Sequence, residues 1–149
     1  MRNAIFIGEH DLTLDDKNRL LVPSDVRRVM SPERDGEGFY VIIGVNRKPW
    51  LFPERYYELL LDREAETLPP EAELNPDLQR LDDWQKRFGM ARRVAWDRQG
   101  RILLPEATLR RTETQRDVTL VGVRNHLELW NRDDWERRFH ELLQPVARP

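Results

Sequence analysis

Apolar residues recur along the chain with two spacings, which predict an alternation of strands and helices. Between residues 5 and 14 an apolar run becomes an alternation in which Leu12 and Leu14 share one face and Thr13 takes the other, as in a half-buried strand. Other short runs rich in β-branched and aromatic residues predict further strands at residues 19–22, 39–45, 50–52, 92–96, 102–104, 118–123 and 127–130. The predicted fold class is therefore α+β.

Helical spacing appears in the segments between these strands. A short helix is expected over residues 24–30, and the acidic, proline-containing residues 64–76 are expected to form an irregular connection. Arg27 and Arg28 are interpreted as capping that short helix. Three longer helices are predicted from apolar stripes formed by Tyr56, Leu59 and Leu60, by Leu78, Leu81, Trp84 and Phe88, and by Trp135, Phe139, Leu142 and Leu143.

One nine-residue stretch occurs twice, as DDKNRLLVP at residues 15–23 and as DRQGRILLP at residues 97–105. A second pair, GVNRKPWLF at residues 44–52 and GVRNHLELW at residues 122–130, repeats the order of the first. The positions shared by the first pair are Asp15, Arg19, Leu21 and Pro23, which match Asp97, Arg101, Leu103 and Pro105. The chain is therefore interpreted as one unit duplicated.

Each copy of the first motif has the chemistry of a tight turn followed by a short strand. An aspartate accepts hydrogen bonds from the backbone just ahead of it, and Asn18 and Gly100 occupy a position where both residue types tolerate φ > 0. Proline then ends the strand, because it lacks a ladder donor. The residues assigned to this structural role are Asp15, Asn18, Pro23, Asp97, Gly100 and Pro105.

Charge is distributed unevenly, although the net charge of the 149 residues is only −2. Residues 64–83 hold seven acids against one base, a local net charge of −6 that leaves +4 for the rest of the chain. A phosphate-binding surface would thus be a local patch. The seven acids are Glu64, Glu66, Glu71, Glu73, Asp77, Asp82 and Asp83.

The sequence contains no pattern that indicates an enzyme active site or a metal site. The chain has no cysteine, its three histidines lie in separate segments, and neither a nucleophile triad nor a Gly-rich phosphate loop occurs. No signal peptide and no apolar run of about 18 residues is present. We therefore expect no enzyme activity, no cofactor, no metal, no small-molecule substrate and no membrane association.

The segments IFIGEH, LDDKNRLLVP, VAWDRQGRILLP and DVTLVGVRNHLELWNRDDWE together resemble the bacterial MraZ family. The resemblance implies a swapped-hairpin, AbrB-like β-barrel formed from two internal repeats with flanking helices. It also implies a cytoplasmic, nucleoid-associated transcriptional regulator of the division and cell-wall gene cluster, including its own promoter. Such proteins form ring-like homo-oligomers that bind short direct repeats in double-stranded DNA.

The resemblance, carried over by position, assigns DNA contacts to the two turn motifs. The expected DNA-binding residues are Lys17, Arg19, Arg98 and Arg101. Asn18 stands where the family usually has glycine, and the polar Thr108 and Thr114 favour a weaker short helix in the second copy. The expected divisions are residues 5–53 and 84–131 for the two repeats, residues 54–83 for a helix and acidic linker, and residues 132–145 for a C-terminal helix.

Alternatives remain open at this stage. The two aspartates are better explained as partners in structural ion pairs, whereas Lys17, Arg19 and Arg101 are weighed between DNA contact and a solvated face. The tryptophans are expected in the core or at subunit contacts rather than as stacking platforms for bases. An AbrB-like antitoxin, which binds a toxin protein and its own operator, is the second functional hypothesis.

Overall fold

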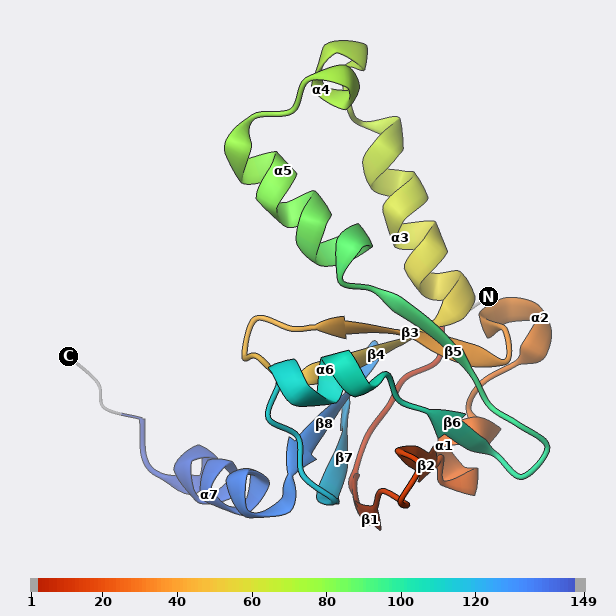
Figure 1. Ribbon diagram of the computed structural model, residues 1–149, viewed down its shortest axis with the longest axis vertical. Helices are drawn as coiled ribbons and strands as arrows, with labels where there is room; N and C mark the ends of the chain where they lie inside the picture. The colour runs from red at the N-terminus through yellow and green to blue at the C-terminus, as the bar shows by residue number, and fades with distance from the viewer. Residues whose placement is uncertain (1–2, 147–149) are drawn as a thin grey trace.

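The computed structural model describes residues 3–146, which form one antiparallel sheet, a separate two-stranded ribbon and several helices (Figure 1). The α+β class is thus confirmed. Within this part of the chain there are eight strands, each inside or adjoining a stretch that the apolar pattern predicts. The six-stranded sheet has the spatial order β1 (Glu9–Thr13), β7 (Asp117–Val123), β8 (His126–Asn131), β4 (Pro49–Pro53), β3 (Gly38–Ile43) and β5 (Arg92–Ala95).

The two halves of the chain exchange strands. The first strand, β1, pairs with β7 of the second half, while β5 of the second half pairs with β3 of the first. The ribbon also joins the halves, because it consists of β2 (Arg19–Leu21) and β6 (Arg101–Leu103). The fully buried side chains come from both halves and include Leu20, Phe39, Leu51, Ile102, Leu127 and Leu129. One core is therefore shared.

The expected closed barrel does not form. Across the described residues, β1 and β5 remain the two edges of the large sheet, and the β2–β6 ribbon pairs with neither of them. The physical reason lies in the ribbon strands, which are three residues long and end before Pro23 and Pro105. Each ribbon strand pairs only with the other one, so the ribbon does not link β1 to β5.

β1 is shorter than the predicted strand over residues 5–14. Gly8 has φ +84°, a conformation outside the strand region, and it separates β1 from a single bridge between Phe6 and Arg124. The backbone therefore turns at Gly8 before the regular pairing begins at Glu9.

Short helices follow the ribbon strands and a helical arm extends from the sheet (Figure 1). α1 (Ser24–Arg28) and α2 (Pro32–Asp35) follow β2, whereas α6 (Glu106–Arg111) follows β6 and α7 (Arg132–Leu143) follows β8. The arm, residues 54–89, comprises α3 (Glu54–Glu66), α4 (Pro70–Leu74), α5 (Leu78–Trp84) and the π-helical turn η1 (Gln85–Gly89). None of the described helices is long and apolar enough to cross a membrane.

Three helical expectations were wrong in detail. Residues 64–76 are largely helical, because Pro69 and Pro70 stand at the start of α4, where proline is tolerated. The buried face of α3 carries Tyr57, 4% exposed, rather than Leu59, 39% exposed. The helix after Pro105 is regular, and its Thr108 is buried together with Leu109.

Candidate nucleic-acid interface

The β2–β6 ribbon has an aliphatic inner face and an outer face that carries two arginines and two leucines. Leu20 and Ile102 stand opposite each other and are fully buried. Because successive side chains of a strand point to opposite sides, Arg19 and Arg101 lie on the outer face. Each stands opposite an exposed leucine of the other strand. The pairing thus places the two motif arginines on one surface.

The first turn is held together by one carboxylate. Oδ1 of Asp15 accepts hydrogen bonds from the backbone N–H groups of Lys17 (2.9 Å) and Arg19 (2.8 Å). Its Oδ2 accepts from Nε of Arg19 at 2.6 Å. Asn18 adopts φ 65°, the positive value expected from its position, and donates its backbone N–H to the carbonyl of Asp15 at 3.1 Å.

The second turn repeats this geometry. Oδ1 of Asp97 accepts from the backbone N–H groups of Gln99 (2.9 Å) and Arg101 (3.0 Å), and its Oδ2 accepts from Nε of Arg101 at 3.0 Å. Gly100 has φ 81°. The expectation of a positive φ at both matching positions is confirmed.

Backbone hydrogen bonds within each turn favour the ionised form of its aspartate. The backbone N–H of Arg19 is the largest influence that lowers the pKa of Asp15 below its usual 3.8, and the backbone N–H of Arg101 does the same for Asp97. Each arginine uses Nε for its aspartate, and within residues 3–146 its two Nη groups have no hydrogen-bond partner. Those groups are therefore available to an external acceptor.

The antiparallel pairing puts the two turns at opposite ends of the ribbon. Asn18 accepts a backbone hydrogen bond from Leu104 at one end, and Gly100 accepts one from Val22 at the other, both at 2.9 Å. Lys17 is exposed in the first turn, where Gln99 is its counterpart, and Arg98 is exposed in the second turn, where it matches Asp16 of the first. Of the four expected DNA-binding residues, Arg19 and Arg101 therefore lie on the ribbon, and Lys17 and Arg98 lie in the turns at its two ends.

Two further arginines support the turns, and neither role was inferred from the sequence. Arg27, which lies with Arg28 in the last turn of α1, also donates from Nε to the carbonyl of Val22 at 3.2 Å. Its guanidinium lies so close to the second turn that a Cβ on Gly100 would be 2.7 Å from Cζ of Arg27. Arg116 donates from Nη1 to the carbonyl of Asp15 at 2.7 Å. Both contacts depend on the fold, so local sequence carries no signal for them.

A second polar cluster lies apart from the ribbon on the large sheet. Glu128, 7% exposed, accepts hydrogen bonds from His126 Nε2 (2.8 Å), Trp130 Nε1 (3.0 Å) and Asn46 Nδ2 (3.0 Å). Burial would raise the pKa of Glu128, but these bonds outweigh burial and lower it. Trp50 stacks on His126 with ring centroids 4.0 Å apart. The cluster therefore ties the β3–β4 loop to β8.

Among the described residues, no group of three or more His, Cys, Asp or Glu side chains is arranged to hold a metal ion. The ribbon with its two Asp–Arg turns is thus the candidate functional site.

The ribbon and the exchanged strands define a small α+β protein with two turns of the same geometry, each holding an arginine paired with an aspartate. Residues 88–146 match the family model described as "MraZ protein, putative antitoxin-like". The chain is 32% identical to the Transcriptional regulator MraZ of Neisseria meningitidis serogroup C, over 93% of this chain and 88% of that protein. It is 33% identical to the protein of the same name from Roseiflexus castenholzii, over 89% and 85% of the two chains.

A third relative, the Transcriptional regulator MraZ of Clostridium tetani, is 29% identical over 89% of this chain and 85% of its own length. These matches extend over nearly the whole chain. The chain belongs to the MraZ family.

Proposed function

We propose that the protein is a transcriptional regulator that binds double-stranded DNA through the outer face of the β2–β6 ribbon. The observation that supports this most directly is that Arg19 and Arg101 share that face, with the exposed Lys17 and Arg98 in the adjoining turns. The names of the relatives point to the same class of function. No catalytic group enters the proposal.

The dimensions of the ribbon suit a DNA groove. Each strand contains three residues, which at about 3.3 Å per residue gives a ladder of roughly 10 Å. The major groove of B-DNA is about 12 Å wide and admits a two-stranded ribbon. In this arrangement the Nη groups of Arg19 and Arg101 would reach guanine O6 and N7 or a phosphate. Lys17 and Arg98 would contact the flanking phosphates.

One ribbon presents few charges, so the proposal includes several copies on one operator. A ring-like homo-oligomer would place identical ribbons on short direct repeats, spaced by about 10 base pairs or a multiple of that length. The proposed targets are promoters of the division and cell-wall gene cluster, including the protein's own promoter. We also propose that the strand exchange is the swapped-hairpin relation between repeats at residues 5–53 and 84–131. Residues 54–83 and 132–145 would be additions to that unit.

An antitoxin is the second candidate, and the description of the matching family model favours it. In that case the same ribbon would bind the operator while another surface binds a toxin protein. Loss of toxicity of a neighbouring gene product on co-expression would support this candidate.

A DNA titration tests the main proposal. Purified protein is titrated with DNA from upstream of its own gene and with the same DNA after its repeats are scrambled. We expect tight binding to the first and weak, salt-sensitive binding to the second. Replacing Arg19 and Arg101 together by alanine should abolish the difference. Arg63→Ala, which removes one exposed positive charge from the arm, is the matched control and should bind as the wild type does. Equal affinity for both DNAs would overturn the proposal.

A further inference from the structure

The side chain of Arg27 lies across the second turn of the ribbon. Its Nε donates to the carbonyl of Val22 at 3.2 Å, and the backbone N–H of Val22 donates to the carbonyl of Gly100 at 2.9 Å. A Cβ on Gly100 would be 2.7 Å from Cζ and 3.0 Å from Nη2 of Arg27. The guanidinium therefore rests on a residue that has no side chain, and helix α1 of the first copy covers the turn of the second.

The geometry of the turn does not require an arginine at this place. The position matched to Arg27 in the second copy is Leu109, which is 7% exposed and lines the same surface hollow as Asn18 of the first turn. The first turn nevertheless has the same hydrogen bonds as the second. An apolar residue is thus compatible with this turn, and support of the turn alone does not explain the positive charge of Arg27.

The guanidinium of Arg27 keeps most of its hydrogen-bonding capacity. Within residues 3–146 only its Nε has a partner. Arg27 makes no ion pair in this part of the chain, whereas its neighbour Arg28 pairs with Asp25 at 3.7 Å. The residue is partly exposed. Its two Nη groups are therefore free to bind an oxyanion, and the bond made by Nε orients them in advance.

Arg27 also changes the charge at this end of the ribbon. Residues 97–101 carry Arg98 and Arg101 against Asp97, a net charge of +1, and Arg27 raises it to +2. A phosphate group that approaches the second turn is attracted by this local excess of positive charge.

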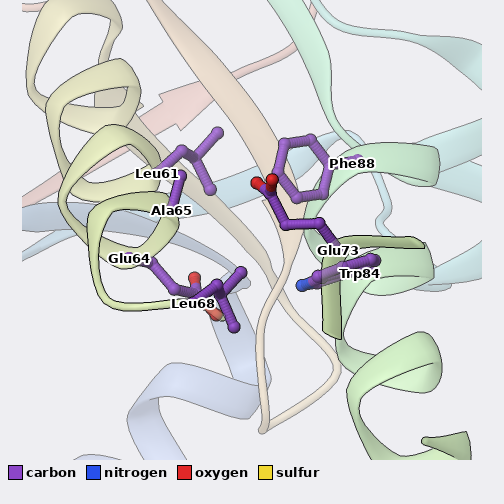
Figure 2. Close-up of a pocket in the computed structure, with 7 residues that line it drawn as sticks. All are labelled: Leu61, Glu64, Ala65, Leu68, Glu73, Trp84 and Phe88. Atoms are coloured by element: carbon purple, nitrogen blue, oxygen red, sulfur yellow. The ribbon is translucent and has the colours of Figure 1, made fainter. Parts of the chain in front are cut away.

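Negative charge on the arm restricts where DNA can approach. Residues 64–83 have a net charge of −6, and Figure 2 shows Glu64 and Glu73 in the hollow between the arm helices, beside Trp84 and Phe88. Phosphate groups are repelled by such a surface. The arm projects away from the ribbon, so its charge does not oppose DNA at the second turn (Figure 1).

We propose that Arg27 is a further DNA-contacting residue, whose Nη groups bind a backbone phosphate beside the second turn. The inference rests on the proposed function, because that proposal places DNA on the ribbon. Arg27 contributes affinity but no base discrimination, since phosphate contacts carry no sequence information directly. It differs in this respect from an arginine that reads guanine.

Salt titrations of two matched variants test this contact. Arg27→Gln removes the charge and keeps a side chain over Gly100, whereas Arg28→Gln removes one charge from the same helix at a side chain that is 76% exposed. Each full-length protein is titrated at several salt concentrations with DNA from upstream of its own gene and with the scrambled DNA. Arg27→Gln should lower the slope of log affinity against log salt by about 0.9 per bound ribbon on both DNAs. The ratio of the two affinities should stay at the wild-type value, and Arg28→Gln should keep the wild-type slope.

Three outcomes would overturn the inference: a wild-type slope in Arg27→Gln, an equal fall of the slope in Arg28→Gln, or a changed affinity ratio in Arg27→Gln. Thermal unfolding establishes that both variants are folded, and Arg27→Met, which keeps an unbranched side chain, replaces Arg27→Gln if it is not. The Arg19→Ala, Arg101→Ala double variant identifies the source of a failure. If it loses the preference for promoter DNA while Arg27→Gln keeps the wild-type slope, the inference alone fails. If the double variant binds as the wild type does, the proposed ribbon interface fails and the inference fails with it.

Discussion

Arg19 and Arg101 are each oriented by an aspartate four residues earlier in the chain. The Nε–Oδ2 distances are 2.6 Å and 3.0 Å, and the arginine side chains are 30% and 31% exposed. A side chain already held in one direction loses less conformational entropy when it binds. In the proposed complex with DNA, the aspartate would therefore contribute to recognition indirectly, by ordering the arginine beforehand.

Arg19→Ala is expected to weaken operator binding while the fold and the assembly mass stay unchanged. The expected loss is about 1–3 kcal/mol per ribbon if the arginine contacts guanine. If it contacts phosphate, the slope of log affinity against log salt should fall by about 0.9 per contact. Titrations at two salt concentrations distinguish these cases. Wild-type affinity with an unchanged slope would remove the first turn from the mechanism.

Arg101→Ala is expected to have an effect of similar size. The sequence favours a smaller one, because Thr108 and Thr114 predict a weak helix after the second motif. In the structure that helix is regular and Thr108 is buried, so this reason for a difference is removed. The same titrations compare the two variants directly. A tenfold difference between them would show that the ribbon contacts DNA asymmetrically.

Acid should weaken the turns in a defined pH window. The pKa of Asp15 and that of Asp97 are lower in the folded protein than the usual 3.8, because backbone N–H groups favour the ionised form. The stabilisation is therefore fully present above the unfolded-state pKa and is lost as pH falls through the lower folded value. The melting temperature of the Asp15→Asn, Asp97→Asn double variant should be below that of wild type at pH 7. The difference should shrink below about pH 4, and a difference independent of pH would contradict this account.

At the scale of the element, the second turn depends on the glycine at its last position. Gly100 combines φ 81° with the guanidinium of Arg27, which a Cβ would approach to 2.7 Å. Gly100→Ala should lower the free energy of unfolding by about 1–2 kcal/mol, measured by urea denaturation. Gly89→Ala is the control, since its Cβ would meet no atom within 4 Å. That helical substitution should be neutral or stabilising by up to about 1 kcal/mol. Equal losses for both variants would argue against strain at Gly100.

At the scale of the whole molecule, neither half contains a complete structure. β1 and β2 pair with strands that lie more than 80 residues later in the chain, and β5 pairs back with β3. Residues 1–76 and residues 77–149, expressed separately, should therefore give no cooperative thermal transition. Mixing the two fragments should restore one. Dispersed amide NMR spectra from either fragment alone would show that the core is not shared.

Local chemistry allowed the sequence to predict much of the ribbon. Aspartate, a residue that accepts positive φ, arginine and proline interact within nine consecutive positions, so the turn and the end of the strand follow from neighbouring residues. The duplication then predicts that both turns share one geometry, which the hydrogen bonds confirm. The same local reasoning missed the phase of α3, because the burial of Tyr57 depends on how the helix leaves the sheet.

The sequence by itself determined the positions of the strands, the conformation of the two turns and the resemblance to the MraZ family, since these depend on residue types and short spacings. Only the tertiary structure decided that the two turns occupy opposite ends of one ribbon, that Arg27 and Arg116 support them, and that the sheet stays open. The physical reason is that strand pairing joins residues about eighty positions apart. The side-chain pattern of a strand does not specify which other strand it pairs with. The packing of the whole core therefore selects the partner strand.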